Sequence, residues 1–244
     1  MKILLLVPFK HDENNERNLR STIPMDIDIK GLSFGDPSDC RYDEALHIVE
    51  TCDAIVQAEQ DGYDAVVIAC QGDPGVDEAR ELVRIPVVAV TKTLLHIAAT
   101  LGEKLCIITP NSYVARRTRQ NANRYGFGNF VSTRTIEVSA RDGIDAYSVY
   151  KETGEYSPLI EQFVQECIAA IEEDQAEVLS TGCGAIMWMS GIAQAELEKR
   201  GYQIPFINPT LAACEFAKAL VNIGVVNPNY PEPVRKTGRA GCCC

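Results

Sequence analysis

The sequence contains little that would place the protein in a membrane or on a nucleic acid. No apolar run approaches the roughly 18 residues that a membrane-spanning helix needs. Asp and Glu outnumber Lys and Arg by 34 to 23, and no basic cluster forms a positive stripe, which disfavours a nucleic-acid or membrane-surface partner. The apolar start at residues 1–7 is too short for a signal sequence and lacks a small-residue cleavage site. We therefore expect a cytoplasmic protein.

Cysteine is abundant, but its arrangement gives little support for a disulfide framework or a metal site. The chain has ten cysteines in 244 residues, and its size and irregular cysteine spacing disfavour a disulfide scaffold. Three of the ten form a run at residues 242–244, and the other seven contain no CxxC pair. No metal site is predicted from this spacing. Because a free cysteine is most often a small buried apolar residue, the question is which of the seven are reactive.

Short runs rich in Val, Ile and Leu alternate with longer segments that have helical periodicity. The strands lack polar alternation, which indicates burial on both faces, as in a parallel sheet. The alternation of strands and helices predicts an α/β fold. Strands are expected at residues 3–7, 65–69, 87–90, 105–109, 178–181 and 206–208. Helices are expected at residues 42–60, 76–83, 92–101, 113–125, 159–173, 185–199 and 211–221.

The chain also resembles itself in three places that keep the same order. Lys-Ile-Leu-Leu-Leu-Val-Pro at the start recurs as Lys-Leu-Cys-Ile-Ile-Thr-Pro, two strands end in cysteine-containing turns, and an Ile-Pro pair with a following Thr occurs twice. This repetition predicts two similar lobes with parallel sheets, related by a pseudo-twofold axis, with the active site in the cleft between them. We expect residues 1–102, completed by 209–226, to form the first lobe and residues 103–208 the second. Residues 227–244 are expected to be a flexible tail.

Two cysteines directly follow strands that correspond in the two halves. Cys70 and Cys183 each stand in a Gly-containing turn that opens a helix, and Asp73 is expected to cap the first of these helices, with Pro74 at its first position. The positive end of a helix dipole favours a thiolate and can hold a negatively charged oxygen. We expect the two thiols to face each other across the cleft.

Two opposed thiols suit the inversion of a carbon acid next to a carbonyl group. One thiolate removes the proton from one face of the carbon, and the opposite thiol returns a proton to the other face. Backbone N–H donors would stabilise the intermediate enolate oxygen, and one such donor is typically worth about 3 kcal/mol. The thiols must then titrate as a coupled pair near the working pH. Neither a redox cofactor nor pyridoxal phosphate is required.

Other residues near the strand ends are candidates for ligand contacts. Thr109, Asn111 and Ser112 follow the strand equivalent to the first strand, and they could bind a carboxylate or ring carbonyl or cap the helix that follows. Gln71 is expected to point into the cleft. The polar segment 141–157, which contains two glycines, is expected to be a loop that borders the cleft.

Each of these candidates has an alternative without chemistry. Cys70 and Cys183 could be two buried structural cysteines, although their Gly-containing turns and equivalence in the repeat favour catalysis. Arg116, Arg117 and Arg119 are most simply a solvated helix face.

The segments around the two cysteines resemble a known family. Residues 69–77 and 85–88 resemble the first-cysteine segment of the hydantoin racemases, within the aspartate/glutamate racemase superfamily, and residues 182–185 resemble that family's second-cysteine loop. The resemblance implies two pseudo-symmetric α/β lobes and a cofactor-independent mechanism with Cys70 and Cys183 as the two bases. It also implies a homo-oligomer.

The chain departs from the family pattern at the ends of two strands. The first strand of the family usually ends in Asn-Pro-Asn, whereas this chain has Val7, Pro8 and Phe9, and the second loop reads Cys-Gly-Ala-Ile in place of Cys-Ala-Gly-Met. The change removes an amide donor from the cleft and adds an apolar wall. The residues expected to bind substrate are Pro8, Phe9, Gln71, Gly72, Thr109, Asn111, Ser112, Gly184 and Ala185.

These observations predict a racemase or epimerase that acts on a small molecule. A 5-substituted hydantoin or related ureide suits a neutral, partly apolar pocket, and an amino acid is the other substrate considered. A maleate-type isomerase or a decarboxylase of the same superfamily would need only one cysteine. A two-lobed binding protein without chemistry has no use for paired thiols, and the sequence shows no export signal.

Overall fold

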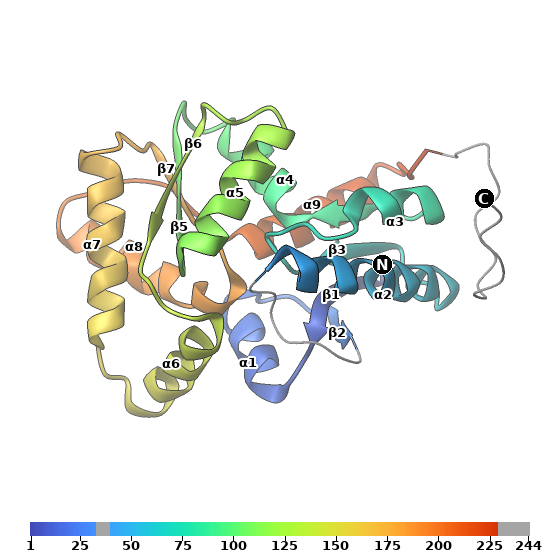
Figure 1. The fold of residues 1–244 in the computed structure, drawn as a ribbon, viewed down its shortest axis with the longest axis horizontal. Coiled ribbons are helices and arrows are strands. Elements are labelled where there is room, and N and C mark those ends of the chain that lie inside the picture. The colour runs from blue at the N-terminus through green and yellow to red at the C-terminus, as the bar shows by residue number, and fades with distance from the viewer. Residues whose placement is uncertain (33–39, 229–244) are drawn as a thin grey trace.

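Two parallel β-sheets form the centres of two lobes in the computed structural model, which describes residues 1–32 and 40–228 (Figure 1). The first sheet contains β1 (Ile3–Lys10), β2 (Asp28–Leu32), β3 (Ala65–Ile68) and β4 (Val87–Ala89). The second contains β5 (Leu105–Thr109), β6 (Val131–Thr135), β7 (Val178–Thr181) and β8 (Phe206–Ile207). The strand orders are β2-β1-β3-β4 and β6-β5-β7-β8, so the same order occurs twice. The predicted α/β fold of two similar parallel-sheet lobes is confirmed.

The central strands are apolar because both of their faces are covered. Alternate residues of a strand point to opposite faces of a sheet, and the first sheet accordingly has one core cluster around Leu4 and Leu6 and another around Leu5 and Val7. In the second sheet, Cys106 and its alternate neighbours face one cluster, and the intervening residues of β5 face the other. Burial of both faces therefore explains the continuous apolar runs.

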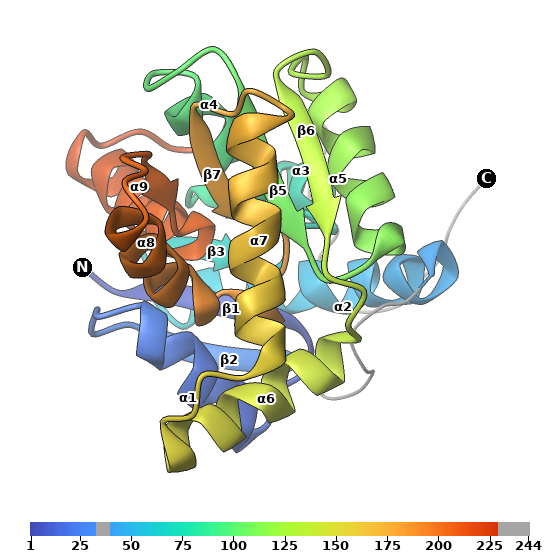
Figure 2. The same cartoon turned by 90° about the vertical axis from the view of Figure 1, so that its left-hand side faces the viewer.

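Helices connect the strands and cover the sheets. They are α1 (Glu13–Thr22), α2 (Arg41–Gln60), α3 (Val76–Leu82), α4 (Val90–Ala98), α5 (Ser112–Arg124), α6 (Ala140–Thr153), α7 (Pro158–Glu172), the 3-10 turn η1 (Gly184–Ile186), α8 (Met189–Lys199) and α9 (Pro209–Asn222). Figure 2 shows α7 lying over the second sheet, and α1 and α6 side by side. In the described chain, no helix has both the length and the apolar character needed to cross a membrane.

The C-terminal helix returns to the first lobe. After leaving the second sheet, α9 packs against α4 and against β1, β3 and β4 (Figure 1). Asn227, the first residue of the predicted tail, donates its backbone N–H to the Arg84 carbonyl at 2.8 Å and its side-chain amide to the Ile85 carbonyl at 2.6 Å. Asn227 is therefore held against the first lobe, and the flexibility of the tail stays a prediction. Its part from residue 229 onward lies outside the described residues.

The predicted loop at 141–157 is wrong, because α6 occupies most of it. Ser139 caps α6 by accepting from the Asp142 N–H, and Gly154, with φ 67°, ends it. The internal Gly143 serves packing, since a Cβ there would lie 3.2 Å from the carbonyl oxygen of Ala185. The two glycines that were interpreted as loop residues therefore have other roles. Gly143 allows α6 to pack closely against η1, and Gly154 ends α6.

Candidate active site

A cavity of about 120 Å³ lies between the two lobes, where β1, β3 and β7 end. Its lining includes residues 7–9 of β1, residues 69–72 after β3 and residues 182–185 after β7, and further side chains come from α1, α2, α5 and α6. Most of the lining surface is apolar. The carboxyl ends of parallel strands are the usual ligand site of α/β sheets, and the cavity occupies the predicted cleft.

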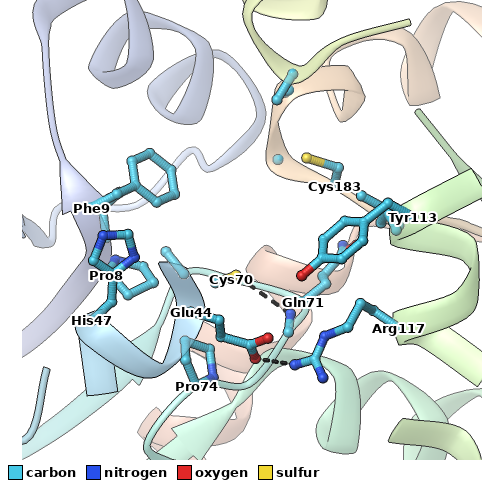
Figure 3. A pocket seen from close by; sticks show the side chains of 18 of the residues that line it. Pro8, Phe9, Glu44, His47, Cys70, Gln71, Pro74, Tyr113, Arg117 and Cys183 are labelled. Carbon is cyan, nitrogen blue, oxygen red and sulfur yellow. Dashed lines mark hydrogen bonds and ion pairs between the residues drawn. The ribbon is translucent and has the colours of Figure 1, made fainter. Parts of the chain in front are cut away.

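Cys70 and Cys183 border this cavity from opposite lobes, and both are partly exposed (Figure 3). The negative charge of a Cys183 thiolate would act on Cys70 and raise its pKa. The remaining described cysteines lie outside the cavity lining. The sequence did not decide which of seven cysteines are reactive, and the structure places two of them, Cys70 and Cys183, at one cavity.

The loop after Cys70 differs from the predicted helix start. α3 begins at Val76, and the residue before it, Gly75, adopts the left-handed conformation with φ 71°. Residues 71–75 therefore separate the thiol from α3, and a helix dipole acts mainly within its first turn. The donor that reaches the thiol is the backbone N–H of Gly72, at 3.4 Å from the sulfur.

Asp73 caps α4, not α3 as predicted. Its carboxylate accepts from the backbone N–H groups of Thr91 at 3.0 Å and Lys92 at 3.1 Å, which belong to the first turn of α4. The hydroxyl of Tyr125 donates to the same carboxylate at 3.0 Å. Burial raises the pKa of Asp73 to about 6, although these three donors act in the opposite direction. Asp73 thus fixes the Cys70 loop to α4 and to the end of α5.

The surroundings of Cys70 favour the neutral thiol. Burial raises the pKa of Cys70 to about 12, the Gly72 N–H opposes this shift, and the negative charges of Cys183, Glu44 and Asp73 add to it. The expectation that a helix dipole stabilises a thiolate is therefore wrong for Cys70. At neutral pH and without a ligand, this thiol is protonated.

The loop after Cys183 is built differently. Cys183 precedes the three-residue turn η1, and α8 begins only after a further break, so the predicted helix over 185–199 is interrupted at its start. Gly182 is required here, because a Cβ at this position would lie 2.4 Å from the Thr109 Cγ2. The Gly184 carbonyl accepts from the Asn18 side-chain amide at 2.9 Å, which ties the loop to α1.

One end of the cavity is polar. Glu44 of α2 and Arg117 of α5 form an ion pair, with side chains that are 15% and 16% exposed (Figure 3). Burial raises the pKa of Glu44, and Arg117 opposes the shift. A Cβ built on Gly72 would lie 3.3 Å from Glu44 Oε1, 3.5 Å from Cys70 Sγ and 3.7 Å from Arg117 Nη2. The three groups therefore converge on Gly72, where an added methyl group would be tightly packed against the Glu44 carboxylate.

Most of the residues predicted to bind substrate line the cavity: Pro8, Phe9, Gln71, Gly72, Asn111, Gly184 and Ala185. Asn111 also caps α5, since its side-chain oxygen accepts from the Val114 N–H at 3.0 Å. The amide nitrogen of Gln71 donates to the Thr181 carbonyl at 2.7 Å and so joins the two lobes. Its buried side-chain oxygen has no hydrogen-bond partner.

Two predicted substrate-binding residues, Thr109 and Ser112, lie outside the cavity lining. Thr109 is fully buried, and its hydroxyl donates to the Arg134 carbonyl at 3.0 Å, which fixes the edge strand β6. Ser112 is exposed as the first residue of α5. Thr109 therefore supports the sheet and Ser112 faces solvent, although Asn111 between them lines the cavity.

The sequence interpretation missed the cavity residues that come from helices: Asn15, Leu19, Glu44, His47, Tyr113, Val114, Arg117, Thr118, Ala140 and Ile144. α1 and α6 were not expected as helices, so their side chains could not be assigned to a face. Arg117 was expected to belong to a solvated helix face. Because residues four positions apart share a helix face, its spacing from Tyr113 could have indicated that both side chains reach the same cavity. Asn15 supplies a side-chain amide to the cavity. It comes from α1, whereas the amide in the family pattern comes from the end of the first strand.

Two parallel-sheet α/β lobes with a cavity between them and a cysteine at each of two equivalent strand ends define a two-lobed protein with a candidate active site in its cleft. The family model described as Asp/Glu/Hydantoin racemase matches residues 32–217, and the chain belongs to this family. The resemblance inferred from the cysteine segments is confirmed. The protein is thus an isomerase of the racemase type.

Individual relatives agree with this assignment. The hydantoin racemase of Pseudomonas sp. (strain NS671) is 30% identical over 203 residues, which are 81% of this chain and 76% of that protein. The fold is similar to that of allantoin racemase from Klebsiella pneumoniae, with a TM-score of 0.81, 23% identity and coverage of 98% and 97% of the two chains. Glutamate racemase from Francisella tularensis subsp. tularensis SCHU S4 is more distant, with a TM-score of 0.61, 18% identity and coverage of 94% and 86%.

Proposed function

We propose that this protein racemises a 5-substituted hydantoin or a closely related cyclic ureide, with Cys70 and Cys183 as its two bases. The observation that carries the proposal is the position of these two thiols, which border one cavity from equivalent strand ends of opposite lobes. No cofactor takes part in the proposed reaction.

The reaction needs one thiolate and one thiol at a time. In the direction in which Cys70 is the base, its thiol first gives its proton to water. The Cys70 thiolate then takes the proton from the carbon between the ring nitrogen and the ring carbonyl, and the electron pair moves into the carbonyl to form an enolate. Cys183 then donates its thiol proton to the opposite face, and the enolate collapses to the enantiomer. Cys70 is left as a thiol and Cys183 as a thiolate, which is the arrangement for the reverse reaction. The two sites therefore titrate as a pair.

The lining favours a neutral ring over a free amino acid. An amino acid brings a carboxylate and an ammonium group, and each needs a partner when it leaves water. Of the described residues that line the cavity, Arg117 is the one Lys or Arg, and it is already paired with Glu44. A hydantoin ring has no formal charge, and its amide edges can meet polar groups while its substituent meets Phe9 and Leu19. The hydantoin and allantoin racemases among the relatives support the same substrate class.

Polarimetry on a panel of hydantoins and amino acids tests the proposal. Wild type should racemise one or more 5-substituted hydantoins and leave amino acids unchanged. Cys70→Ser and Cys183→Ser should each lose at least about 1,000-fold of the racemisation rate, because removal of a paired catalytic group typically has effects of this order.

Cys52→Ser provides the matched control. Cys52 is a buried cysteine of the same lobe that contacts the Gly75 carbonyl and lies outside the cavity lining, so its variant should keep the wild-type rate. Racemisation at the wild-type rate by both Cys70→Ser and Cys183→Ser would refute the two-base assignment. Activity on amino acids alone would refute the substrate class.

A further inference from the structure

Tyr113 places a buried hydroxyl with no protein partner in the cavity. The residue stands in the first turn of α5, and its ring projects from the second lobe toward the polar end of the cavity (Figure 3). The hydroxyl oxygen is shielded from solvent and makes no hydrogen bond within the protein. A buried polar group left without a partner costs about 1–3 kcal/mol. Such a group is retained where something outside the protein supplies the partner.

The surroundings of this hydroxyl favour its protonated form, which can donate a hydrogen bond. Burial raises the pKa of Tyr113, and the charge of Glu44 raises it further, while Arg117 opposes the shift. The hydroxyl therefore keeps its proton at neutral pH. Arg117 follows on the same face of α5 one turn later and is held by its ion pair with Glu44. The Tyr113 hydroxyl, Glu44 and Arg117 thus lie at the same polar end of the cavity, and Cys70 lies beside them.

We infer that the Tyr113 hydroxyl is a catalytic hydrogen-bond donor to the substrate carbonyl oxygen that becomes the enolate. This inference rests on the proposed racemisation in the same cavity. Proton removal by either cysteine moves negative charge onto that oxygen, so a donor aimed at it stabilises the transition state more than the bound substrate. Because both directions pass through the same enolate, the donor serves both directions equally.

The Tyr113→Phe variant tests this role without changing the shape of the ring. For the hydantoin that wild type racemises best, kcat should fall on the order of 100-fold in both directions, as for other single oxyanion donors, with KM within about threefold of wild type. The melting temperature should stay the same or rise, because the substitution removes a buried hydroxyl that has no partner.

Tyr156→Phe is the matched control, since the Tyr156 hydroxyl is exposed and bonds to Glu161 outside the cavity. Its kcat should equal that of wild type. A Tyr113→Phe enzyme with wild-type kcat overturns the inference and leaves the racemase proposal intact. A rise of KM alone also overturns it, because that result indicates equal binding of substrate and transition state. If wild type racemises no hydantoin, the proposed function fails and this inference fails with it.

Discussion

The loops after Cys70 and Cys183 occupy the same place in the two lobes but are built from different contacts. Residues 71–75 hold Cys70 well ahead of α3, and Asp73 anchors that loop to α4. Cys183 leads directly into η1, which packs against α1 and α6. The repeated topology thus preserves the position of the thiol and not its environment.

This difference has a chemical consequence. Cys70 lies beside the ion pair of Glu44 and Arg117, whereas in the loop of Cys183 the side chain nearest to Gly184 is the apolar Leu19. The two faces of a bound ring would therefore experience unlike surroundings. We expect the two bases to be unequal in their titration and in their tolerance of substitution, and the following predictions concern that inequality.

The largest expected effect is the pH dependence of proton removal by Cys70. In Cys183→Ser, where Cys70 is the remaining base, exchange of the substrate α-proton should rise about tenfold per pH unit between about pH 6 and pH 9. The reason is that burial is the largest cause of the raised Cys70 pKa and remains when Cys183 is replaced. The pKa therefore stays above this range, and the thiolate fraction grows tenfold per unit throughout it. Proton NMR in deuterated buffer measures the rate. A plateau below about pH 8 would show that Cys70 titrates as an ordinary thiol.

The next effect concerns stability and the anchor of the Cys70 loop. Burial raises the pKa of Asp73 from 3.8 to about 6, so the folded protein binds this proton more tightly than the unfolded chain does. The contribution of Asp73 to the free energy of unfolding should therefore fall by about 3 kcal/mol as pH rises from about 3 to about 7, and then stay constant. Asp73 has a left-handed φ of 50°, which Asn tolerates, so Asp73→Asn is the reference.

Urea unfolding of wild type and Asp73→Asn at several pH values measures this contribution. It is the difference between the free energies of unfolding of the two proteins. A difference in the free energy of unfolding that does not change between pH 4 and pH 8 would contradict a raised pKa of Asp73 in the folded protein. No corresponding change is expected for variants of the Cys183 loop, because η1 has no acidic residue.

The smallest expected effect compares one methyl group in the two loops. Gly72→Ala places a Cβ 3.3 Å from the Glu44 carboxylate and 3.5 Å from the Cys70 sulfur, whereas at Gly184 the nearest atom is Leu19 Cδ2 at 3.9 Å. We expect Gly72→Ala to lower kcat/KM about tenfold, equivalent to about 1.4 kcal/mol, and Gly184→Ala to stay within about twofold. Steady-state racemisation kinetics of the two variants and of wild type give the kcat/KM values to compare. Equal losses in the two variants would show that the loops are equally crowded.

The sequence was sufficient to predict the elements that are buried on both faces. β5 and β7 have the predicted bounds because their apolar runs are continuous. β2 and β6 were missed because they are edge strands whose residues are mostly exposed or only partly buried and include polar residues such as Asp28 and Arg134. α1 was missed because the residues it buries include Asn15 and Asn18, which give no apolar periodicity.

The candidate site was predictable only where it depends on strand ends. Cys70 and Cys183 could be placed in one cleft because parallel strands bring their carboxyl ends to one edge. Glu44 and Arg117 could not, since they lie 73 residues apart on helices of different lobes and meet through tertiary packing. Asp73 was assigned to the wrong helix because a local capping pattern does not show that α4 lies closer to the carboxylate in space.

Directional isotope exchange tests the central claim most directly. In deuterated buffer at one pH, each enantiomer of an accepted hydantoin is incubated separately with Cys70→Ser and with Cys183→Ser, and deuterium at the α-carbon is measured together with optical purity. We expect exchange without inversion, from one enantiomer in the first variant and from the opposite enantiomer in the second. Exchange of both enantiomers by the same single-cysteine variant would contradict it, because one sulfur would then reach both faces of the carbon.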